Sequence, residues 1–265
     1  MALLRAIPAA LGRLAHPLCA RAAAVVAVAA VALLNVGCAS GPAQPRVLRA
    51  PYDGERVWAV APFLNESGVS TVDGASVADR FVSEIEEVDG LRCLPLNRTL
   101  AAMQQLGMTE LGDVRQIYTL MRAMQVDGLV IGTVTDWDPY KPLRFGAAVE
   151  VLTVASGSIT QPLDLKDLTM PTTDGVAALD GGVLAVSQAS RLFDARNNET
   201  LRQLELYATG RSDESSALGT RVYELRLDLF TRFGAYVLVR DLLEQEAARL
   251  GVPLPGGRAE RPPAE

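Results

Sequence analysis

The chain has 265 residues, of which 49% are hydrophobic and 5% aromatic, and its net charge is −6. Removal of residues 1–37, which carry three arginines and no acidic residue, leaves 22 basic and 31 acidic residues and a net charge of −9. An acidic chain is repelled by phosphate backbones, which argues against nucleic acid as a partner. The length suits one domain or two small ones.

Histidine and cysteine usage excludes several classes of enzyme. The single histidine, His16, lies within residues 1–37, so the remaining chain has none to act as a general base or a metal ligand. This excludes Ser-His and Cys-His catalysis and most zinc sites. With Cys19 removed and Cys38 modified, only Cys93 remains, so no disulfide can form within one chain. We therefore expect no catalytic residue, no metal and no cofactor.

Residues 1–37 have the pattern of an export signal. Three arginines precede Ala22 to Leu34, an uninterrupted apolar run of 13 residues. That length fits the hydrophobic part of a signal peptide, whereas a membrane span needs roughly 20 residues. An uncleaved signal anchor and an ordinary secretory signal are the alternatives.

The end of this run carries a lipidation motif. It reads Leu34-Asn35-Val36-Gly37-Cys38 and resembles the lipobox of bacterial lipoproteins, although Asn35 stands where a leucine is usual. The resemblance implies lipidation of Cys38 and attachment to a membrane. Ala39 follows the cysteine in place of the aspartate that retains such proteins at the inner membrane. This implies the outer membrane, facing the periplasm, with the inner membrane as the alternative.

Proline-rich segments flank the expected domain. We expect residues 38–54 to be the lipidated cysteine and a flexible tether, and residues 251–265 to be a disordered tail. Between them, residues 55–250 show no internal repeat and no strong boundary, which predicts a single domain large enough to bury a core.

The first half of this domain alternates apolar runs with helical patterns. Strands are predicted at 57–64, 91–96 and 129–135. Helices are predicted after the capping residues Asp73, Asn97 and Asp113. In the first of them the apolar side chains recur at helical spacing, and the predicted water-facing residues are Asp79, Glu84, Glu86 and Glu87.

The second half of the domain has a different pattern. Residues 145–154 and 183–192 read as strands, and Asn197-Asn198 as the turn of a hairpin that continues into 201–207. Residues 216–250 predict a C-terminal helical segment with a break near Gly234. The fold class is therefore α/β, a mixed sheet covered by helices.

A family resemblance covers about residues 56–135. Val60 to Gly68 reads V-A-P-F-L-N-E-S-G; an amphipathic helix follows, and then Gly90-Leu91-Arg92 enters a strand. Asp127-Gly128 precedes a further apolar strand that contains Gly132. This layout resembles the amino-terminal domain of TolB, and it is shared by the envelope lipoproteins LpoB and CsgG. The resemblance implies an α/β envelope module that binds other proteins, without catalytic residues.

Two groups of residues are candidates for partner binding. Asn65, Glu66 and Ser67 form a loop after a buried strand, where α/β folds often bind ligands. The alternative is that Asn65 and Ser67 only hold the loop together. The second group is Trp137 and Tyr140, which offer an aromatic contact or only packing at the rim.

Three other positions have structural interpretations. Asp136 and Asp138 would share one side of a strand but lack the further oxygen ligands of a calcium site, so we expect a solvated strand end. Cys93 lies in an apolar strand and is expected in the core.

These observations predict a membrane-anchored, non-catalytic lipoprotein that binds another envelope protein as a scaffold or regulator. The alternative is a ring-forming secretion or assembly subunit of the CsgG type, which would self-associate. Residues 145–154 lack the lipid-facing alternation of a membrane hairpin, so the scaffold is favoured over the ring.

Overall fold

The computed structural model describes residues 46–154, 175–179, 182–213 and 215–253. Predicted lipidation at Cys38 and most of the predicted tail lie outside these residues. The strands are β1 Arg56–Val60, β2 Leu64–Asn65, β3 Leu91–Cys93, β4 Gly128–Asp138, β5 Arg144–Val154, β6 Gly175–Leu179 and β7 Gly182–Asp194. The helices are α2 Gly74–Glu86, α3 Leu96–Gln105, α4 Val114–Met124, α5 Asn198–Ala208, α6 Val222–Leu225 and α7 Leu227–Leu250, with a 3₁₀ turn at Gly219–Arg221.

The strands form one mixed sheet in the order β3-β1-β4-β5-β7-β6, with β2 paired to the second half of β4. β3, β1, β2 and β4 are parallel, and β5, β7 and β6 continue the sheet in antiparallel pairing. The parallel part contains the strand–helix alternation that the sequence predicts, and the antiparallel part contains the long strands of the second half. The predicted fold class, a mixed sheet covered by helices, is confirmed.

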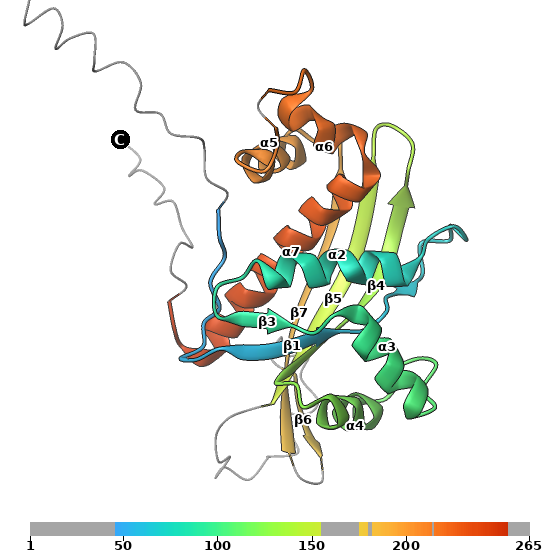
Figure 1. Cartoon of the computed structure of the whole chain (residues 1–265), viewed down its shortest axis with the longest axis vertical. Coiled ribbons are helices and arrows are strands. Elements are labelled where there is room, and N and C mark those ends of the chain that lie inside the picture. The colour runs from blue at the N-terminus through green and yellow to red at the C-terminus, as the bar shows by residue number, and fades with distance from the viewer. Residues whose placement is uncertain (1–45, 155–174, 180–181, 214, 254–265) are drawn as a thin grey trace, which may run out of the picture. The chain divides into compact units, whose positions relative to one another are not determined.

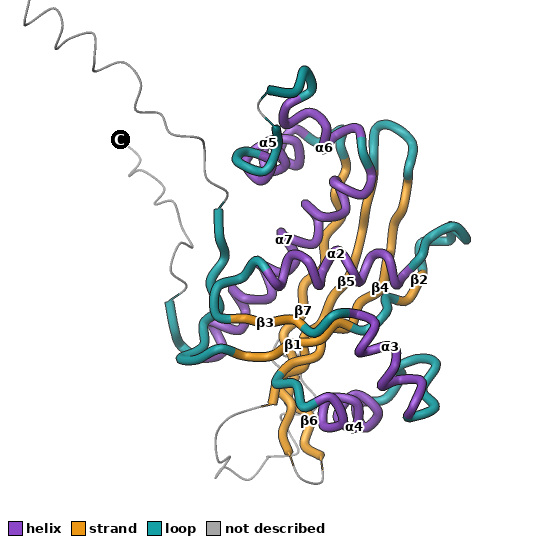
Figure 2. The backbone as a smooth tube through the Cα atoms, viewed as in Figure 1, coloured by secondary structure: helices purple, strands orange, loops and turns teal. Residues whose placement is uncertain are grey.

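Helices cover the two faces of this sheet unequally. α2 and α7 cross together on one face, where they share a core with β1, β4, β5 and β7 (Figure 1). α5 and α6 lie next to the first turns of α7 (Figure 2). On the other face, α3 and α4 pack over Ala59, Leu129 and Leu152 in a smaller core. Among the described residues, no helix is both long and apolar enough to span a bilayer.

Capping residues begin the helices largely where the sequence predicts. Asp73 accepts a hydrogen bond from the Ala75 amide at 3.0 Å, and Asp113 accepts one from the Arg115 amide at 3.1 Å. The predicted cap at Asn97 is wrong by two residues, because the cap of α3 is Pro95 and the helix begins at Leu96. Proline supplies the extended φ and ψ of a cap without a side-chain hydrogen bond.

The predicted hairpin at residues 197–207 is wrong. Asn197 instead caps helix α5, and its side-chain oxygen accepts a hydrogen bond from the Glu199 amide at 2.8 Å. Asparagine favours a helix cap as well as a turn, since its short amide can bond to the backbone two residues on in either. Leu204, Tyr207 and Ala208 then recur on one buried face of the helix.

The predicted break near Gly234 is also wrong, because α7 is continuous from Leu227 to Leu250. Gly234 is required for packing. A Cβ atom at this position would lie 2.6 Å from the Phe145 ring and 3.2 Å from the Phe193 ring, both buried in the sheet. The missing side chain therefore lets α7 lie directly on β5 and β7. The real interruption of the helical segment is at Arg226, which is extended between α6 and α7.

The folded domain begins before residue 55. The Ala50 amide donates to Asp89 O at 2.9 Å, and the Asp89 amide donates to Leu48 O at 2.8 Å. Ala50 is buried, and the Tyr52 hydroxyl donates to Glu246 on α7 at 2.8 Å. The last part of the predicted tether is thus packed on the domain, because its apolar residues and backbone find partners there.

Gly234→Ala tests the close approach of α7 to the sheet. Helix propensity alone would make alanine about 1 kcal/mol more stable than glycine in a helix interior. The clash with the Phe145 ring should outweigh this gain. We expect the free energy of unfolding of the variant to be about 1–3 kcal/mol lower than that of the wild type. Urea denaturation measures the difference, and a stabilised variant would contradict the packing.

Candidate functional site

Part of the second sheet face is exposed, and it is the best candidate for a binding surface. We call it the open face, and it consists of Ile131 and Thr133 of β4, Ala148 and Glu150 of β5, and Gln188, Ser190 and Leu192 of β7. Strand register places these residues in neighbouring rows, with Glu150 opposite both Ile131 and Gln188, and Ala148 opposite both Thr133 and Ser190. No described helix covers the β7 part of this face, where Leu192 is 56% exposed.

A pocket of about 440 Å³ lies at the edge of the open face. Its lining comes from the segment joining β1 to β2, from α3 and the loop after it, and from β4 and β5. The lining residues are Ala61, Pro62, Phe63, Leu64, Asn65, Met103, Thr109, Glu110, Leu111, Ile131, Gly132, Thr133, Ala148 and Glu150. This volume falls within the range of small-molecule and side-chain pockets.

The interruption between β1 and β2 helps to shape this pocket. The sequence predicts one strand over 57–64, but the chain leaves regular pairing at Pro62, which has no amide hydrogen to donate. The Ala61 amide still donates to Val130 O at 2.8 Å, whereas the Phe63 amide donates to Gly74 O at 3.2 Å, outside the sheet. The Phe63 ring then lies against Gly132, where a Cβ atom would be only 2.4 Å away.

The lining of the pocket combines apolar side chains with two acidic residues. Glu110 and Glu150 are its only ionisable lining residues, and it has no lysine or arginine in its lining. Neither carboxylate makes a hydrogen bond or ion pair within the part of the chain that the structure describes. Glu150 is half-buried, so its charge is partly desolvated without a neutralising partner.

Of the predicted loop residues, only Asn65 lines the pocket. Its side-chain oxygen accepts hydrogen bonds from the Ser67 amide at 3.1 Å and the Ser67 hydroxyl at 2.7 Å, and its amide donates to Val69 O at 2.9 Å. Gly68 has a φ of 76°, which a glycine adopts without strain. The side chains of Asn65 and Ser67 therefore hold the loop together, and Glu66 is exposed. A role of these residues in partner binding remains a prediction.

Trp137 and Tyr140 lie away from the pocket that Asn65 lines. Trp137 lies against the core on the α2–α7 face, edge-on to Phe145 with ring centroids 6.0 Å apart. It lines a second pocket, of about 270 Å³, whose other residues include Asp73, Arg80 and Asp228. Tyr140 is 79% exposed in the loop after β4. Trp137 therefore serves the packing of its own face, and Tyr140 remains available to a partner.

Asp136 and Asp138, near the loop after β4, both have polar partners close by. Asp136 pairs with Arg144 across β4 and β5, and Asp138 accepts a hydrogen bond from the Tyr140 amide at 3.0 Å. The predicted solvated strand end is thus partly wrong, because Arg144 neutralises Asp136. Within the described ranges, no three metal-ligating side chains come together.

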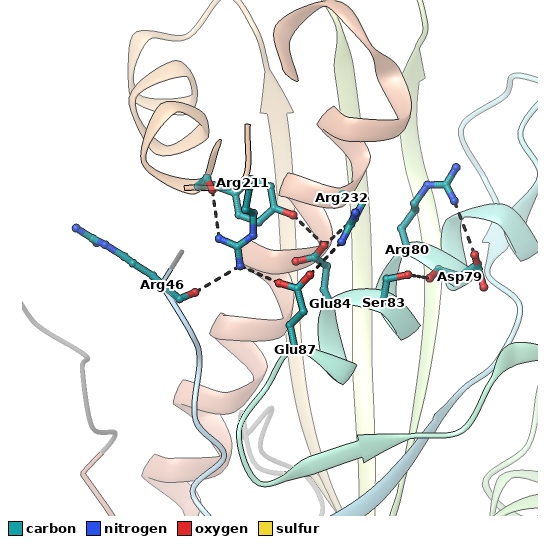
Figure 3. Close-up of polar contacts among 9 residues, drawn as sticks. Arg46, Asp79, Arg80, Ser83, Glu84, Glu87, Arg211 and Arg232 are labelled. Carbon is teal, nitrogen blue, oxygen red and sulfur yellow. Dashed lines mark hydrogen bonds and ion pairs between the residues drawn. The ribbon is translucent and has the colours of Figure 1, made fainter. Parts of the chain in front are cut away.

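Sequence reasoning missed the buried carboxylate Glu84, which was predicted to face water. It is only 2% exposed, and one of its oxygens accepts hydrogen bonds from the Tyr207 hydroxyl at 2.8 Å and from Arg232 at 2.9 Å (Figure 3). Its other oxygen has no hydrogen-bond partner. Burial raises the pKa of Glu84, and the hydrogen bond from Tyr207 and the charge of Arg232 only partly oppose that shift.

Arg211 extends this cluster to the incoming chain. It donates to Glu87 at 2.9 Å and to the backbone oxygen of Arg46 at 3.4 Å, as Figure 3 shows. Its guanidinium also lies over the Tyr207 ring, 4.4 Å from the centroid. The cluster thereby joins α2, the segment after α5, and residue 46. These contacts are structural, because every charged group in them already has a partner of opposite charge or an aromatic ring.

A second buried carboxylate, Glu246 of α7, has the opposite pKa shift. It is fully buried and accepts hydrogen bonds from Ser187 at 2.7 Å, from Tyr52 at 2.8 Å and from Arg249 at 2.7 Å. Burial alone would raise its pKa, but these donors outweigh burial and hold the pKa below its ordinary value. Glu246 therefore stays ionised and ties α7 to β7 and to the incoming chain.

Cys93 is buried, as the sequence predicts, and burial raises the pKa of its thiol to about 12. A thiol that remains protonated is a poor nucleophile. The described residues thus offer two structural carboxylate networks and an open sheet face with a pocket at its edge.

Comparisons with known proteins find similarity at the level of solved structures. No known family's sequence model matches the chain, and no curated protein sequence matches it. Solved structures of similar fold include the LpoB C-terminal domain from Salmonella enterica, at 11% identity and a TM-score of 0.32 over 38% of this chain and 74% of that one. Lipoprotein GNA1162 from Neisseria meningitidis has 18% identity and a TM-score of 0.32 over 54% and 86% of the two chains.

A third similar structure is the PelC dodecamer from Paraburkholderia phytofirmans, at 13% identity and a TM-score of 0.29 over 77% of this chain and 93% of that one. At these scores the fold assignment rests on the strand order and register of this chain, which are described above.

Glu246→Gln and Glu84→Gln should change stability with opposite dependence on pH. Ionised Glu246 stabilises the fold above its ordinary pKa of 4.5, and this contribution is lost as the pH falls through its lowered pKa. Glu246→Gln should therefore reduce the unfolding free energy by about 3 kcal/mol at pH 7 and by less under acid conditions.

The raised pKa of Glu84 has the reverse effect. Its contribution is complete below pH 4.5 and is lost as the pH rises through the raised pKa, so Glu84→Gln should cost less at pH 7 than at pH 4. Denaturant unfolding of both variants between pH 4 and 7 gives the two profiles. Parallel profiles would contradict the assignment of opposite shifts.

Proposed function

We propose that this chain is a membrane-anchored, non-catalytic lipoprotein of the bacterial cell envelope that binds another envelope protein through its open face. The observation that carries the proposal is the pocketed open face itself, a sheet surface of mixed apolar and polar side chains whose β7 part no described helix covers. A concave surface that combines apolar side chains with a few polar groups is the usual form of a binding site.

The lipid anchor is the second part of the proposal. The sequence motif ending at Cys38 supports diacylglyceryl attachment and palmitate on the processed cysteine, and Ala39 supports the outer membrane as the location. The packed segment from Leu48 to Tyr52 supports an arrangement in which a short tether leads directly into the domain.

The absence of an enzymatic role is proposed from chemistry. No histidine remains after residue 37, and the thiol of Cys93 is buried with a raised pKa. Lys141 is one of only two lysines in the chain, and it lies in the loop beside exposed Tyr140, away from the pocket lining. A scaffold or regulator needs none of these groups.

Lipidation of Cys38 is tested by labelling cells with palmitate. The full-length protein should incorporate the label, and Cys38→Ser should abolish incorporation and release the protein from the membrane fraction. Cys93→Ser is the matched control and should keep both the label and the membrane location, since Cys93 is buried. Labelling that persists in Cys38→Ser would contradict the lipoprotein assignment.

Partner binding is tested by a photo-reactive amino acid at Ser190 of the open face in the full-length protein in cells. We expect a discrete cross-link to a different envelope protein, and a much weaker one from the control position Glu205, which is exposed on α5. A ladder of cross-links to the protein itself would favour the ring-forming subunit instead. Equal cross-linking from both positions would contradict binding through the open face.

A further inference from the structure

The chemistry of the pocket deepens the proposed function and rests on it. Glu150 lies in the middle of β5, with Ile131 and Gln188 opposite it on the neighbouring strands. On its own strand, Ala148 and Leu152 share its face, since alternate residues of a strand point the same way. Its half-buried carboxylate therefore has apolar side chains, the Gln188 amide and the hydroxyls of Thr133 and Ser190 as neighbours, and no basic residue among them.

Three carboxylates that the fold shields from water have an arginine beside them. Glu84 has Arg232 at 2.9 Å, and Glu246 has Arg249 at 2.7 Å. Asp241 of α7 forms an ion pair with Arg191 of β7. Glu150 differs from these three, because no ion pair reaches it from any described residue.

The pocket beside Glu150 complements a cation next to an apolar group. Its apolar lining includes Met103, Leu111 and Ile131, and its two charges are both negative. A phosphate or an anionic lipid would be repelled there. A bound metal ion would need a third protein ligand, and the described residues provide no such group.

We propose that this pocket binds a polypeptide segment of the partner that presents an arginine or lysine beside an apolar side chain. Glu150 is the counter-ion of that cation, and Glu110 adds a second negative charge at the rim. Arginine fits best, because its planar guanidinium can donate two parallel hydrogen bonds to the Glu150 carboxylate. The apolar neighbour fills the space beside Ile131 and Leu111.

The test uses a phage-displayed library of random heptapeptides, selected against the full-length lipidated protein in detergent micelles. The wild-type protein should enrich peptides in which arginine or lysine adjoins a large apolar residue. Glu150→Gln should reduce that enrichment at least tenfold. The matched control Glu205→Gln removes one negative charge from an exposed position outside the pocket and should leave the enrichment unchanged.

A selected peptide is then compared with its citrulline analogue, which keeps the shape of arginine without its charge. The arginine peptide should shift the NMR methyl signal of Ile131 and bind the wild-type protein about tenfold more tightly than the citrulline peptide does. Glu150→Gln should remove this difference. No preference for basic peptides, or equal losses in Glu150→Gln and Glu205→Gln, would overturn the proposal.

The failure of this inference can be distinguished from failure of the proposed function. If Ser190 cross-links an envelope protein in cells while the selection shows no basic preference, the open face binds a partner but Glu150 is not its counter-ion. If no envelope protein cross-links while the peptide preference depends on Glu150, the pocket chemistry is correct and the proposed partner is wrong.

Discussion

Helix α7 lies directly against β5 and β7 because Gly234 has no side chain where the Phe145 and Phe193 rings pass beneath it. This contact brings 24 residues of helix onto one face of the sheet, alongside α2. The remaining helices of the α/β part, α3 and α4, pack on the other face near β1, the first half of β4 and the Leu152 end of β5. The antiparallel strands are thus covered along one side and only at one end on the other. The binding surface is a consequence of this unequal coverage.

Two buried carboxylates join the helices of this face to one another and to the sheet. Glu84 joins α2 to α5 and α7 through Tyr207 and Arg232, and Glu246 joins α7 to β7 and to Tyr52. Because residues from Leu48 onward are packed on the domain, only about nine residues separate Cys38 from the folded part. A fully extended chain of that length reaches about 30 Å, so a lipid anchor at Cys38 would keep the domain close to the membrane surface.

Local patterns in the sequence predicted most of the fold. The parallel strands, the caps Asp73 and Asp113, the long strands of the second half and the burial of Cys93 all follow from apolar periodicity and capping chemistry. The errors at Asn197 and Gly234 have one cause. Asparagine suits both turns and helix caps, and glycine suits both breaks and close contacts, so the choice depends on distant residues such as Phe145.

The candidate site was harder to predict from sequence. The loop of Asn65 was predicted as a binding loop, and Asn65 lines the pocket, but its role in binding stays a prediction. Trp137 lies on the opposite face, and Glu150 was not among the predicted residues. The signal for Glu150 was present, since a glutamate among Ala148 and Leu152 is unusual on a strand face that is fully covered. Interpreting that glutamate required knowing that α7 covers the other face of the sheet. The exposure of Glu84 was mistaken for the same reason, because its partners Tyr207 and Arg232 are more than 120 residues away.

The central claim is that the open face of the sheet is occupied by a partner in the envelope. Carbodiimide labelling of carboxylates, read by mass spectrometry, tests it on the full-length protein in intact cells and on the purified protein. We expect Glu150 to be labelled in the purified protein and protected in cells, while exposed Glu205 is labelled equally in both. Equal labelling of Glu150 in both states would contradict the claim and show that this face is free in the envelope.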